Sequence, residues 1–559
     1  MKKISSKKKF IILVLIIVLV RFLISFYLSS FYIRNLTYDD KLMIDQMTSL
    51  TGGDFLGAYS EFTLIKGIIF PIVISFCKIT HISYSMFFTI LYILSVMYFI
   101  KPFEKLIKNK KILFIFFIFL LFNPITYSSE LFQRLYRNSL SIIELLFFLG
   151  IVIRILLSDD KTKRSIINYI LLGLITSIMY LTREDNIWTK LVLLFIIIYK
   201  CIKNSNLKKK NFKVILASII PFVVLTINLN IVSLINYKNY GIYTYNEIQD
   251  SEFKNTFRKV LQIKDDEKKD KVSIPKTTFF KLVENVKSFN LTEREINQYY
   301  KVLIDDTGEI YNGNIIWYFR QFIFKKNKFK DGKEAEKYFK KMGEEIDEAF
   351  EDGRLEKEFA FSSILLNVPT YNEYINMHKN LFKIVGYTST YKNVKTYTDF
   401  SKFKYDKDVG AYSVVNLDSH TTENIVEKND TKYEIIRIIY MILTIILAPC
   451  ALIIYLINIK RKDIYNIITS IILFIYLIIL AGVSYTDATA FPTMRYLCLG
   501  NLYILQTIFI MLNVYRFYNR KNNWQNSVVG DILLLNNNRR KRWRKTKRIK
   551  HYLLYLFYF

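Results

Sequence analysis

Residues 10–33 read FIILVLIIVLVRFLISFYLSSFYI, an apolar run long enough to cross the hydrocarbon core of a membrane as a helix. Nine further apolar runs follow along the 559 residues. The sequence therefore predicts a mainly α-helical polytopic membrane protein of about ten transmembrane helices. A shorter run at 67–79 predicts a helix that lies at the membrane interface. The nine further runs are 83–100, 112–125, 140–157, 166–181, 188–202, 214–235, 435–457, 464–484 and 496–514.

The composition combines two features that soluble proteins rarely combine. Hydrophobic residues make up 52% of the chain and aromatic residues 16%, yet the formal net charge is +31. So many long apolar runs exclude a soluble enzyme. The high hydrophobicity excludes an intrinsically disordered chain. A membrane protein with basic loops and a nucleic-acid binder with a large core remain, and the position of the charge decides between them.

The basic residues lie on one side of the predicted membrane topology. With a cytoplasmic amino terminus, the segments assigned to the inside hold 34 basic and 5 acidic residues, a net charge of +29. Basic residues are retained on the cytoplasmic side of membrane proteins. The charge therefore orients the helices, both termini are expected to be cytoplasmic, and nucleic acid is not needed as a partner. The inside segments are 1–9, 101–111, 158–165, 200–213, 459–463 and 515–559.

The basic tail at 539–550, RRKRWRKTKRIK, could bind RNA or anionic lipid. We favour a cytoplasmic anchor beside the membrane. Residues 236–432 separate the seventh and eighth spans on the outer side, and their helix-like charge pattern predicts one mostly helical extracytoplasmic domain. The expected organisation is an N-terminal transmembrane module at 1–235 with its first external loop at 34–82, this domain, a second transmembrane module at 433–517, and the tail at 518–559.

The first external loop gathers ionisable residues close to the membrane. Asp39 and Asp40 are adjacent, and partial loss of solvent near hydrocarbon can tune the basicity of such carboxylates. One of them could act as a general base, or both could cap a juxtamembrane helix. Sequence physics alone favours capping slightly, although one carboxylate could cap while the other reacts. The other candidate residues of this loop are Tyr38, Glu61 and Lys66.

Three short external loops combine arginines with acidic residues. If the helices form a bundle, these loops converge near Asp40, and their arginines could hold a phosphate group through paired hydrogen bonds. The same arginines could instead pair with neighbouring acids or reach lipid headgroups. The loops are 129–138 (SELFQRLYRN), 182–186 (TREDN) and 485–496 (YTDATAFPTMRY), and they supply Arg134, Arg137, Arg183, Glu184, Asp185, Arg495 and Tyr496.

Motifs for other chemistries are missing from the sequence. The four histidines have no metal-ligand spacing, no pair of cysteines is closely spaced, and neither GxxxxGK[ST] nor GxGxxG occurs. A nucleotide-driven pump or P-loop enzyme is therefore not expected. The two halves of the chain do not resemble inverted copies, which lowers the expectation of a secondary transporter.

The order of these parts resembles the membrane-embedded GT-C glycosyltransferases, which use polyprenyl-phosphate sugar donors. An early acidic motif, an interfacial helix with a proline and a late Arg-Tyr pair follow one another as in that superfamily. The chain departs from many members by having Asp-Asp where they have Asp-Glu, and by placing its large domain before the last spans. Within that superfamily, the chain more specifically resembles a group of uncharacterised bacterial proteins. The matching stretches are Asp39-Asp40-Lys41-Leu42-Met43, residues 66–71 (KGIIFP), residues 134–139 (RLYRNS), residues 182–185 (TRED) and Arg495-Tyr496.

The resemblance implies an inverting glycosyltransferase of the bacterial cell envelope that moves a sugar from a lipid-linked phosphate donor to an acceptor on the outer face. The acceptor would be an envelope glycan, lipid or protein. Asp40, or else Asp39, would be the general base, and Arg134, Arg137, Arg183 and Arg495 would bind the donor phosphate. Some members require a divalent ion, for which Asp39, Asp40 and Asp185 could supply oxygen ligands. A flippase for a lipid-linked saccharide and a non-catalytic envelope protein are the alternatives.

Overall fold

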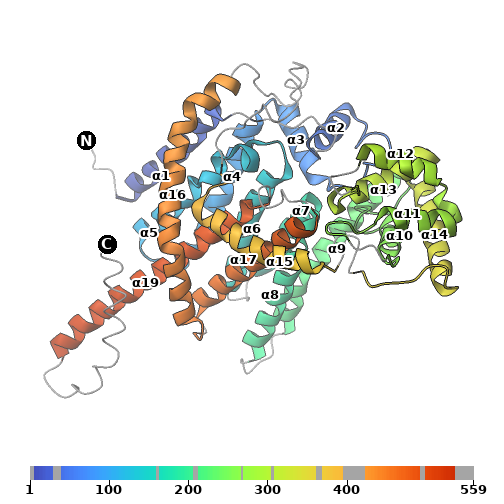
Figure 1. The fold of residues 1–559 in the computed structure, drawn as a ribbon. Helices are drawn as coiled ribbons and strands as arrows, with labels where there is room; N and C mark the ends of the chain where they lie inside the picture. The colour runs from blue at the N-terminus through green and yellow to red at the C-terminus, as the bar shows by residue number, and fades with distance from the viewer. Residues whose placement is uncertain are drawn as a thin grey trace.

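The computed structural model contains a long helical bundle with a smaller helical unit at one end (Figure 1). It describes residues 6–28, 30, 39–158, 163–205, 212–265, 269–303, 308–360, 368–394, 422–461, 463–490 and 498–534. Within these ranges the regular elements are helices, and the β-type contacts are isolated bridges, such as those between Ile263 and Lys357 and between Lys269 and Val272. The expectation of a mainly α-helical chain is confirmed.

Each predicted span corresponds to a helix of the bundle. Within the described ranges, seven helical segments are long and apolar enough to cross a membrane by length and composition, namely Tyr84–Lys105, Lys110–Tyr127, Arg137–Leu156, Ser165–Thr182, Lys213–Tyr240, Lys432–Asn458 and Ile464–Thr489. The other three predicted spans overlap α1, α8 and α19, which are not among these seven, so the count of about ten transmembrane helices stays a prediction. The bundle helices are α1 (Ser6–Ile24), α4 (Tyr84–Ile100), α5 (Lys110–Leu121), α6 (Arg137–Leu156), α7 (Lys163–Thr182), α8 (Trp188–Ser205), α9 (Phe212–Tyr240), α16 (Thr422–Asn458), α17 (Ile464–Thr489) and α19 (Gly500–Leu534).

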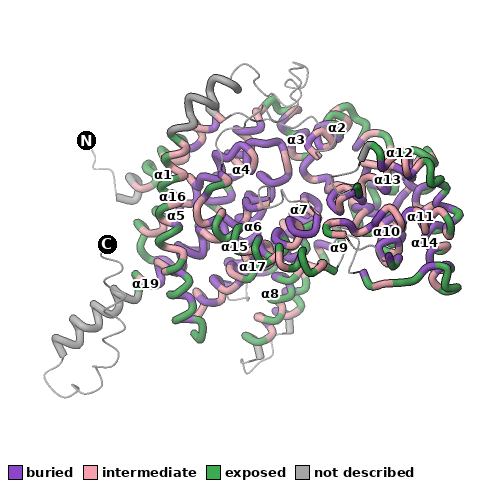
Figure 2. Tube along the Cα trace, viewed as in Figure 1, coloured by how far each residue is buried: buried purple, intermediate pink, exposed green. Residues whose placement is uncertain are grey.

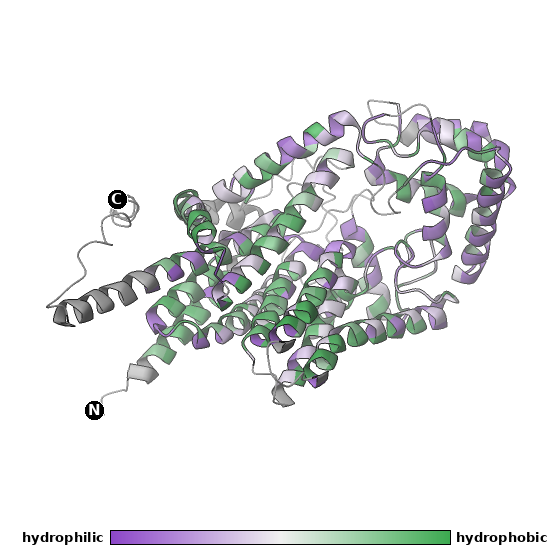
Figure 3. Ribbon diagram, turned by 90° about the horizontal axis from the view of Figure 1, so that it is seen from below, coloured by the Kyte–Doolittle hydropathy of each residue, from purple (hydrophilic) through white to green (hydrophobic). Residues whose placement is uncertain are grey.

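The outward faces of these helices are apolar as well as exposed. Val223, Ile227 and Ile231 of α9 and Ile446 and Ile453 of α16 are all exposed. Figure 2 shows exposed positions along α16, and Figure 3 shows hydrophobic residues along the same bundle helices. Apolar side chains exposed on the outer faces of a helical bundle are expected where the surrounding medium is the hydrocarbon of a membrane.

Helix α6 lies within the core of the bundle and is buried over most of its length. It packs against α4 and α7, and α19 also reaches it. Gly150 allows the close approach of α4, because a Cβ there would lie 3.0 Å from the Tyr98 ring and 3.2 Å from the Phe99 Cα. A central helix of this kind fixes the position of the loop that precedes it.

The loop between α1 and α4 carries two helices that cover one end of the bundle (Figure 1). They are α2 (Asp39–Gly52) and α3 (Ile69–Thr80), which pack against each other. The predicted short apolar helix at 67–79 therefore corresponds to α3. Short helical segments connect the remaining elements: η1 (Ser25–Tyr27), η2 (Lys101–Lys105), η3 (Pro124–Tyr127), η4 (Ser129–Gln133), η5 (Glu184–Ile187) and η6 (Lys287–Phe289).

A second hydrophobic core lies in the insert between α9 and α16. It extends from Phe253 to Ala360 and is rich in phenylalanine. Its helices are more hydrophilic on their surfaces than the bundle (Figure 3), as expected for a unit in water. They are α10 (Glu252–Leu261), α11 (Lys276–Asn285), α12 (Glu293–Leu303), α13 (Asn312–Asn327) and α14 (Gly332–Glu351).

The last helix of the insert belongs to the bundle by its packing. This helix, α15 (Tyr371–Thr390), packs against α17 and α16, and Ile384 joins the bundle core. Its buried Asn380 donates a hydrogen bond of 2.9 Å from Nδ2 to Oδ2 of Asp487. The insert therefore contains a separate core followed by a helix that returns to the membrane-type helices. The border predicted at 433 stays a prediction.

Candidate active site

The two aspartates of the first loop form the first turn of α2. The helix begins at Asp39, and Met43 and Met47 bury its inner face. Acidic residues in a first turn are favoured by the helix dipole. The same two carboxylates also have cationic partners from other loops, so the structure shows a helix start and an ionic site in one place.

Asp40 is held by Arg134 in a two-point ion pair. Arg134 donates from Nε to Oδ2 at 2.7 Å and from Nη2 to Oδ1 at 2.6 Å. The side chain of Asp40 is 0% exposed and that of Arg134 is 5% exposed. Burial alone would lower the pKa of Arg134, but the Asp40 carboxylate raises it above the ordinary value. Because breaking a pair this buried would leave an uncompensated charge, the pair holds the loop of Arg134 against the start of α2.

Asp39 lies beside Asp40 but is more accessible, with a side chain that is 20% exposed. The Tyr136 hydroxyl donates a hydrogen bond to Oδ2 at 2.9 Å, and Nζ of Lys66 lies 2.9 Å from the same oxygen. Arg137 lies 3.6 Å away. Burial works against ionisation of Asp39, yet Lys66 and Arg137 hold its pKa below the usual value. The pKa of Lys66 is raised despite burial, because of the Asp39 carboxylate.

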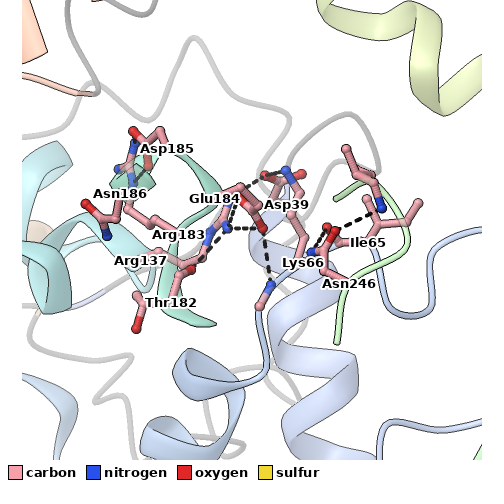
Figure 4. Close-up of polar contacts among 12 residues, drawn as sticks. Asp39, Ile65, Lys66, Arg137, Thr182, Arg183, Glu184, Asp185, Asn186 and Asn246 are labelled. Carbon is pink, nitrogen blue, oxygen red and sulfur yellow. Dashed lines mark hydrogen bonds and ion pairs between the residues drawn. The ribbon is translucent and has the colours of Figure 1, made fainter. Parts of the chain in front are cut away.

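Arg137 joins the first loop to the end of α7. Its Nη1 donates to both oxygens of Glu184, at 2.9 and 2.8 Å, and to the carbonyl of Thr182 at 3.2 Å. The backbone N–H of Gly67 donates to Glu184 at 3.2 Å. Figure 4 shows Arg137 and Lys66 close to Asp39 and Glu184. Glu184 therefore links the segment before α3 to the arginine at the start of α6.

Glycine is required at position 67 by this close approach. A Cβ at Gly67 would lie 1.9 Å from the carbonyl oxygen of Leu181, which is backbone and cannot rotate away. Contact with α7 therefore explains the glycine of the Lys66-Gly67 pair. The lysine of the pair contacts Asp39.

Arg183 faces a different acid. It donates from Nε and Nη2 to Asp185 at 2.9 and 2.6 Å, and it also bonds Asn138. Its Nη2 lies 3.3 Å from Sγ of Cys498, just before α19. Burial works against the charge, but Asp185 raises the pKa of Arg183 well above the ordinary value. Arg183 therefore connects the cluster to the residue just before α19. Figure 4 shows Arg183 beside Asp185.

The predicted site residues fall into three groups. Eight of them converge in one cluster of four acids and four bases. Glu61 lies in the same loop, but its contact is the backbone carbonyl, which accepts a 2.9 Å hydrogen bond from Nε of Arg320. Tyr38, Arg495 and Tyr496 lie outside the described residues. The converging residues are Asp39, Asp40, Lys66, Arg134, Arg137, Arg183, Glu184 and Asp185.

Three participants were not among the predicted site residues. Tyr136 donates to Asp39, and its position between two arginines of the same loop was the available signal. Trp317 of α13 lies under Lys66, with Nζ 4.9 Å from the ring centroid. Glu144, in α6, is buried and accepts a 2.6 Å hydrogen bond from the Thr182 hydroxyl. No sequence spacing links Trp317 to Lys66, because 251 residues separate them.

The proposed oxygen ligands for a divalent ion are not grouped in a way that fits one. Asp40 is bound at both oxygens by Arg134, and Asp185 is bound by Arg183 on the far side of the cluster. Among the described residues, no group of three or more His, Cys, Asp or Glu side chains could hold a metal ion. We therefore derive no step through a metal.

Comparison with known proteins finds similarity at the level of structure. No protein-family model and no curated protein sequence matches the chain. The archaeal oligosaccharyltransferase AglB from Archaeoglobus fulgidus, solved with an inhibitory peptide and a dolichol-phosphate, aligns with a TM-score of 0.41 and 11% identity. The alignment covers 99% of this chain and 55% of AglB, so the chain spans about half the length of that protein. A likeness of this size carries no argument about function, which has to rest on the contacts of the site.

Proposed function

We propose that this protein is a membrane glycosyltransferase that moves a sugar from a lipid-linked phosphate to a cell-envelope acceptor on the outer face. The observation that carries the proposal is the meeting of Asp39 with Lys66, Tyr136 and Arg137 at a partly exposed position. A transfer of this kind needs a proton acceptor for the attacking hydroxyl and positive charge for the departing phosphate. Both lie within one cluster.

The two aspartates have contacts that favour different roles. Both oxygens of Asp40 bond Arg134, and neither residue is open to solvent. Asp39 keeps part of its surface accessible, and its contacts with Tyr136, Lys66 and Arg137 fall on Oδ2. The contacts therefore favour Asp39 as the general base and Asp40 as a positioning residue that fixes α2.

Lys66 and Arg137 are the groups best placed to meet the donor phosphate. Lys66 is 15% exposed beside Asp39. Arg137 is buried, and its Nε has no hydrogen-bond partner among the described residues although it is a strong donor. Arg134 and Arg183 are held by their own carboxylates and serve to shape the site. Arg495 remains a further candidate from the sequence.

The reaction then follows as one displacement. The acceptor hydroxyl gives its proton to the Asp39 carboxylate while its oxygen forms a bond to the anomeric carbon. The bond between that carbon and the phosphate oxygen breaks, and the electron pair leaves with the phosphate. Lys66 and Arg137 stabilise the charge that develops there, and attack from the face opposite the phosphate inverts the anomeric centre. Because phosphate draws these cations away from Asp39, donor binding also makes this carboxylate a better base.

The test is a reconstitution that distinguishes bond breaking from movement between leaflets. The full chain is placed in liposomes with polyprenyl-phosphate sugars labelled in the sugar, together with an envelope membrane extract as acceptor. A transferase releases polyprenyl phosphate and places the label in a new glycoside of inverted configuration. A flippase changes only the leaflet that holds the labelled lipid, and this result, or unchanged donor throughout, would contradict the proposal.

A further inference from the structure

Arg21 is a buried cation in the first apolar helix that takes no part in the acid–arginine cluster. Its side chain is 0% exposed, although Leu19, Val20 and Leu23 around it on α1 are exposed. Arg21 thus points from the outer helix into the bundle, while its neighbours face outward. Ionisable residues inside membrane-type helices are costly and usually serve a function.

The guanidinium of Arg21 has an aromatic contact but no hydrogen-bond acceptor among the described residues. Its Cζ lies 4.8 Å from the ring centroid of Tyr127 in η3. None of its three nitrogens has a hydrogen-bond partner in the part of the chain that the structure describes. The buried Arg134, Arg137 and Arg320 each have a carboxylate partner instead.

The magnitudes show that the aromatic contact does not compensate for this burial. The attraction between a cation and a tyrosine ring is weak compared with an ion pair. Removing a charge from water costs far more than such a contact returns, and only a partner with good hydrogen-bond geometry offsets that cost. A bound anion would supply acceptors for the five N–H donors of a guanidinium.

Tyr127, the aromatic partner of Arg21, carries a further donor. The Tyr127 hydroxyl is buried without a partner among the described residues, and so is the Thr89 hydroxyl on α4. Tyr92, one turn after Thr89, lies close enough to Arg21 for the charge to act on it. The ring of Tyr433, in α16, stacks on Tyr127 with centroids 4.8 Å apart. Arg21 and Tyr127 therefore lie in contact and carry donors that an acceptor would satisfy, and the Tyr433 ring packs against Tyr127.

We propose that Arg21 and Tyr127 bind the phosphate of a membrane lipid. A guanidinium binds phosphate oxygens through two parallel hydrogen bonds, and the tyrosine hydroxyl adds a third donor. The apolar outer face of α1 favours a phosphate that arrives on a hydrocarbon tail over one dissolved in water. This site is separate from the Asp39 cluster, and the proposal does not depend on glycosyl transfer.

The test measures lipid binding to the full chain after delipidation in detergent. Three probes are added separately: inorganic phosphate, phosphatidylglycerol and a polyprenyl phosphate. Binding is followed by native mass spectrometry and by the rise in Tm. We expect one or both lipids to bind and stabilise the protein, and inorganic phosphate to have no effect. The lipid that binds identifies the source of the phosphate.

Substitutions of Arg21 and Tyr127 test whether these two residues are the phosphate ligands. Arg21→Leu should weaken lipid binding about tenfold or more, because it removes a charged two-point contact. It should also raise the Tm of the lipid-free protein, because it removes an unpaired buried charge. Tyr127→Phe keeps the ring and should cause a smaller loss. Arg154→Leu is the matched control, since Arg154 lies 3.6 Å over the Tyr98 ring but bonds the Tyr98 carbonyl.

Three results would overturn the proposal. Equal lipid binding by the wild type and Arg21→Leu would show that Arg21 is not a ligand. Binding of inorganic phosphate as strong as that of the lipids would remove the role of the tail. Absence of binding by all three probes to the wild type would remove the site.

Discussion

At the residue scale, accessibility separates two neighbouring aspartates that look equivalent in sequence. Asp40 and Asp39 both lie in the first loop, but only Asp39 keeps part of its side chain accessible beside a lysine and a tyrosine. Partial exposure is what a base needs, because the acceptor hydroxyl has to reach it. The lowered pKa of Asp39 favours its ionised form. In the proposed reaction the donor phosphate would then raise the basicity of this carboxylate by drawing the neighbouring cations away.

A pH profile tests the link between Lys66 and Asp39. Asp39 has a pKa below the usual value, so its carboxylate form is present above that pKa and is lost as pH falls through it. Lys66→Met removes the nearest cation, so the acid limb of kcat/KM should move to higher pH. Lys41→Met is the control, because Lys41 pairs with Asp45 on the exposed face of α2. An unchanged acid limb in Lys66→Met would contradict the role given to Lys66.

Substitution of Asp40 tests its positioning role. Asp40→Asn leaves the Arg134 guanidinium buried opposite a neutral group, and breaking a buried pair of this kind costs about 3–5 kcal/mol. We expect a clear fall in Tm in detergent. Asp45→Asn is the control on the same helix, since Asp45 is 58% exposed and should leave Tm unchanged. If Asp40→Asn kept the wild-type Tm and lost only activity, Asp40 would be the better candidate for the base.

At the scale of elements, the cluster depends on contact between the first loop and the end of α7. Gly67→Ala would place a methyl group 1.9 Å from the Leu181 carbonyl oxygen, so the loop must move and carry Lys66 with it. We expect a loss of about 1–3 kcal/mol in unfolding free energy and a fall in transfer activity. Gly482→Ala, in α17, is the matched control, because a Cβ at that position would meet nothing within 4 Å. Wild-type activity and Tm in Gly67→Ala would contradict this account of the contact.

The positions of the membrane-type helices could be predicted from sequence because hydrocarbon requires long apolar runs. The short helix α3 was also predicted from its length.

The packing of α15 on α17 could not be predicted, because α15 mixes apolar and polar residues and its partner Asp487 lies 107 positions after Asn380. The sequence predicted that the loops at 34–82, 129–138 and 182–186 converge. It did not predict which arginine pairs with which acid, because each loop contains both positively and negatively charged residues. Arg21 lies in a predicted span that contains no other charged residue, and nothing in that run indicates what the arginine contacts.

At the scale of the whole molecule, one buried arginine connects the smaller unit to the first loop. Arg320 of α13 donates at 2.6 Å from Nη1 to Glu247, which precedes α10, and it also bonds the Glu61 carbonyl. The Tyr59 hydroxyl donates to the same Glu247 at 3.1 Å. The first loop, the segment before α10 and the smaller helical unit therefore meet at the ion pair between Arg320 and Glu247. This contact helps to place Trp317 beside Lys66.

Removal of this arginine should loosen the unit as a whole. Arg320→Met leaves Glu247 buried without its cation, at a cost of about 3–5 kcal/mol. We expect a lower Tm and faster proteolysis of the insert, and the second change Glu247→Gln should restore part of the loss. Arg354→Met is the control, because Arg354 and Asp352 form an exposed pair. Unchanged protease resistance in Arg320→Met would show that the smaller unit is held by other contacts.

The most direct measurement of the central claim is single-turnover transfer by Asp39→Asn beside Asp45→Asn. Each variant is reconstituted with labelled polyprenyl-phosphate sugar and acceptor extract, and donor binding is measured on the same samples. We predict that Asp39→Asn binds the donor as well as or better than the wild type but transfers sugar at least about a hundredfold more slowly, because general base catalysis of this kind contributes that much. Asp45→Asn should match the wild type. Transfer by Asp39→Asn at the wild-type rate would contradict the claim that this carboxylate accepts the proton.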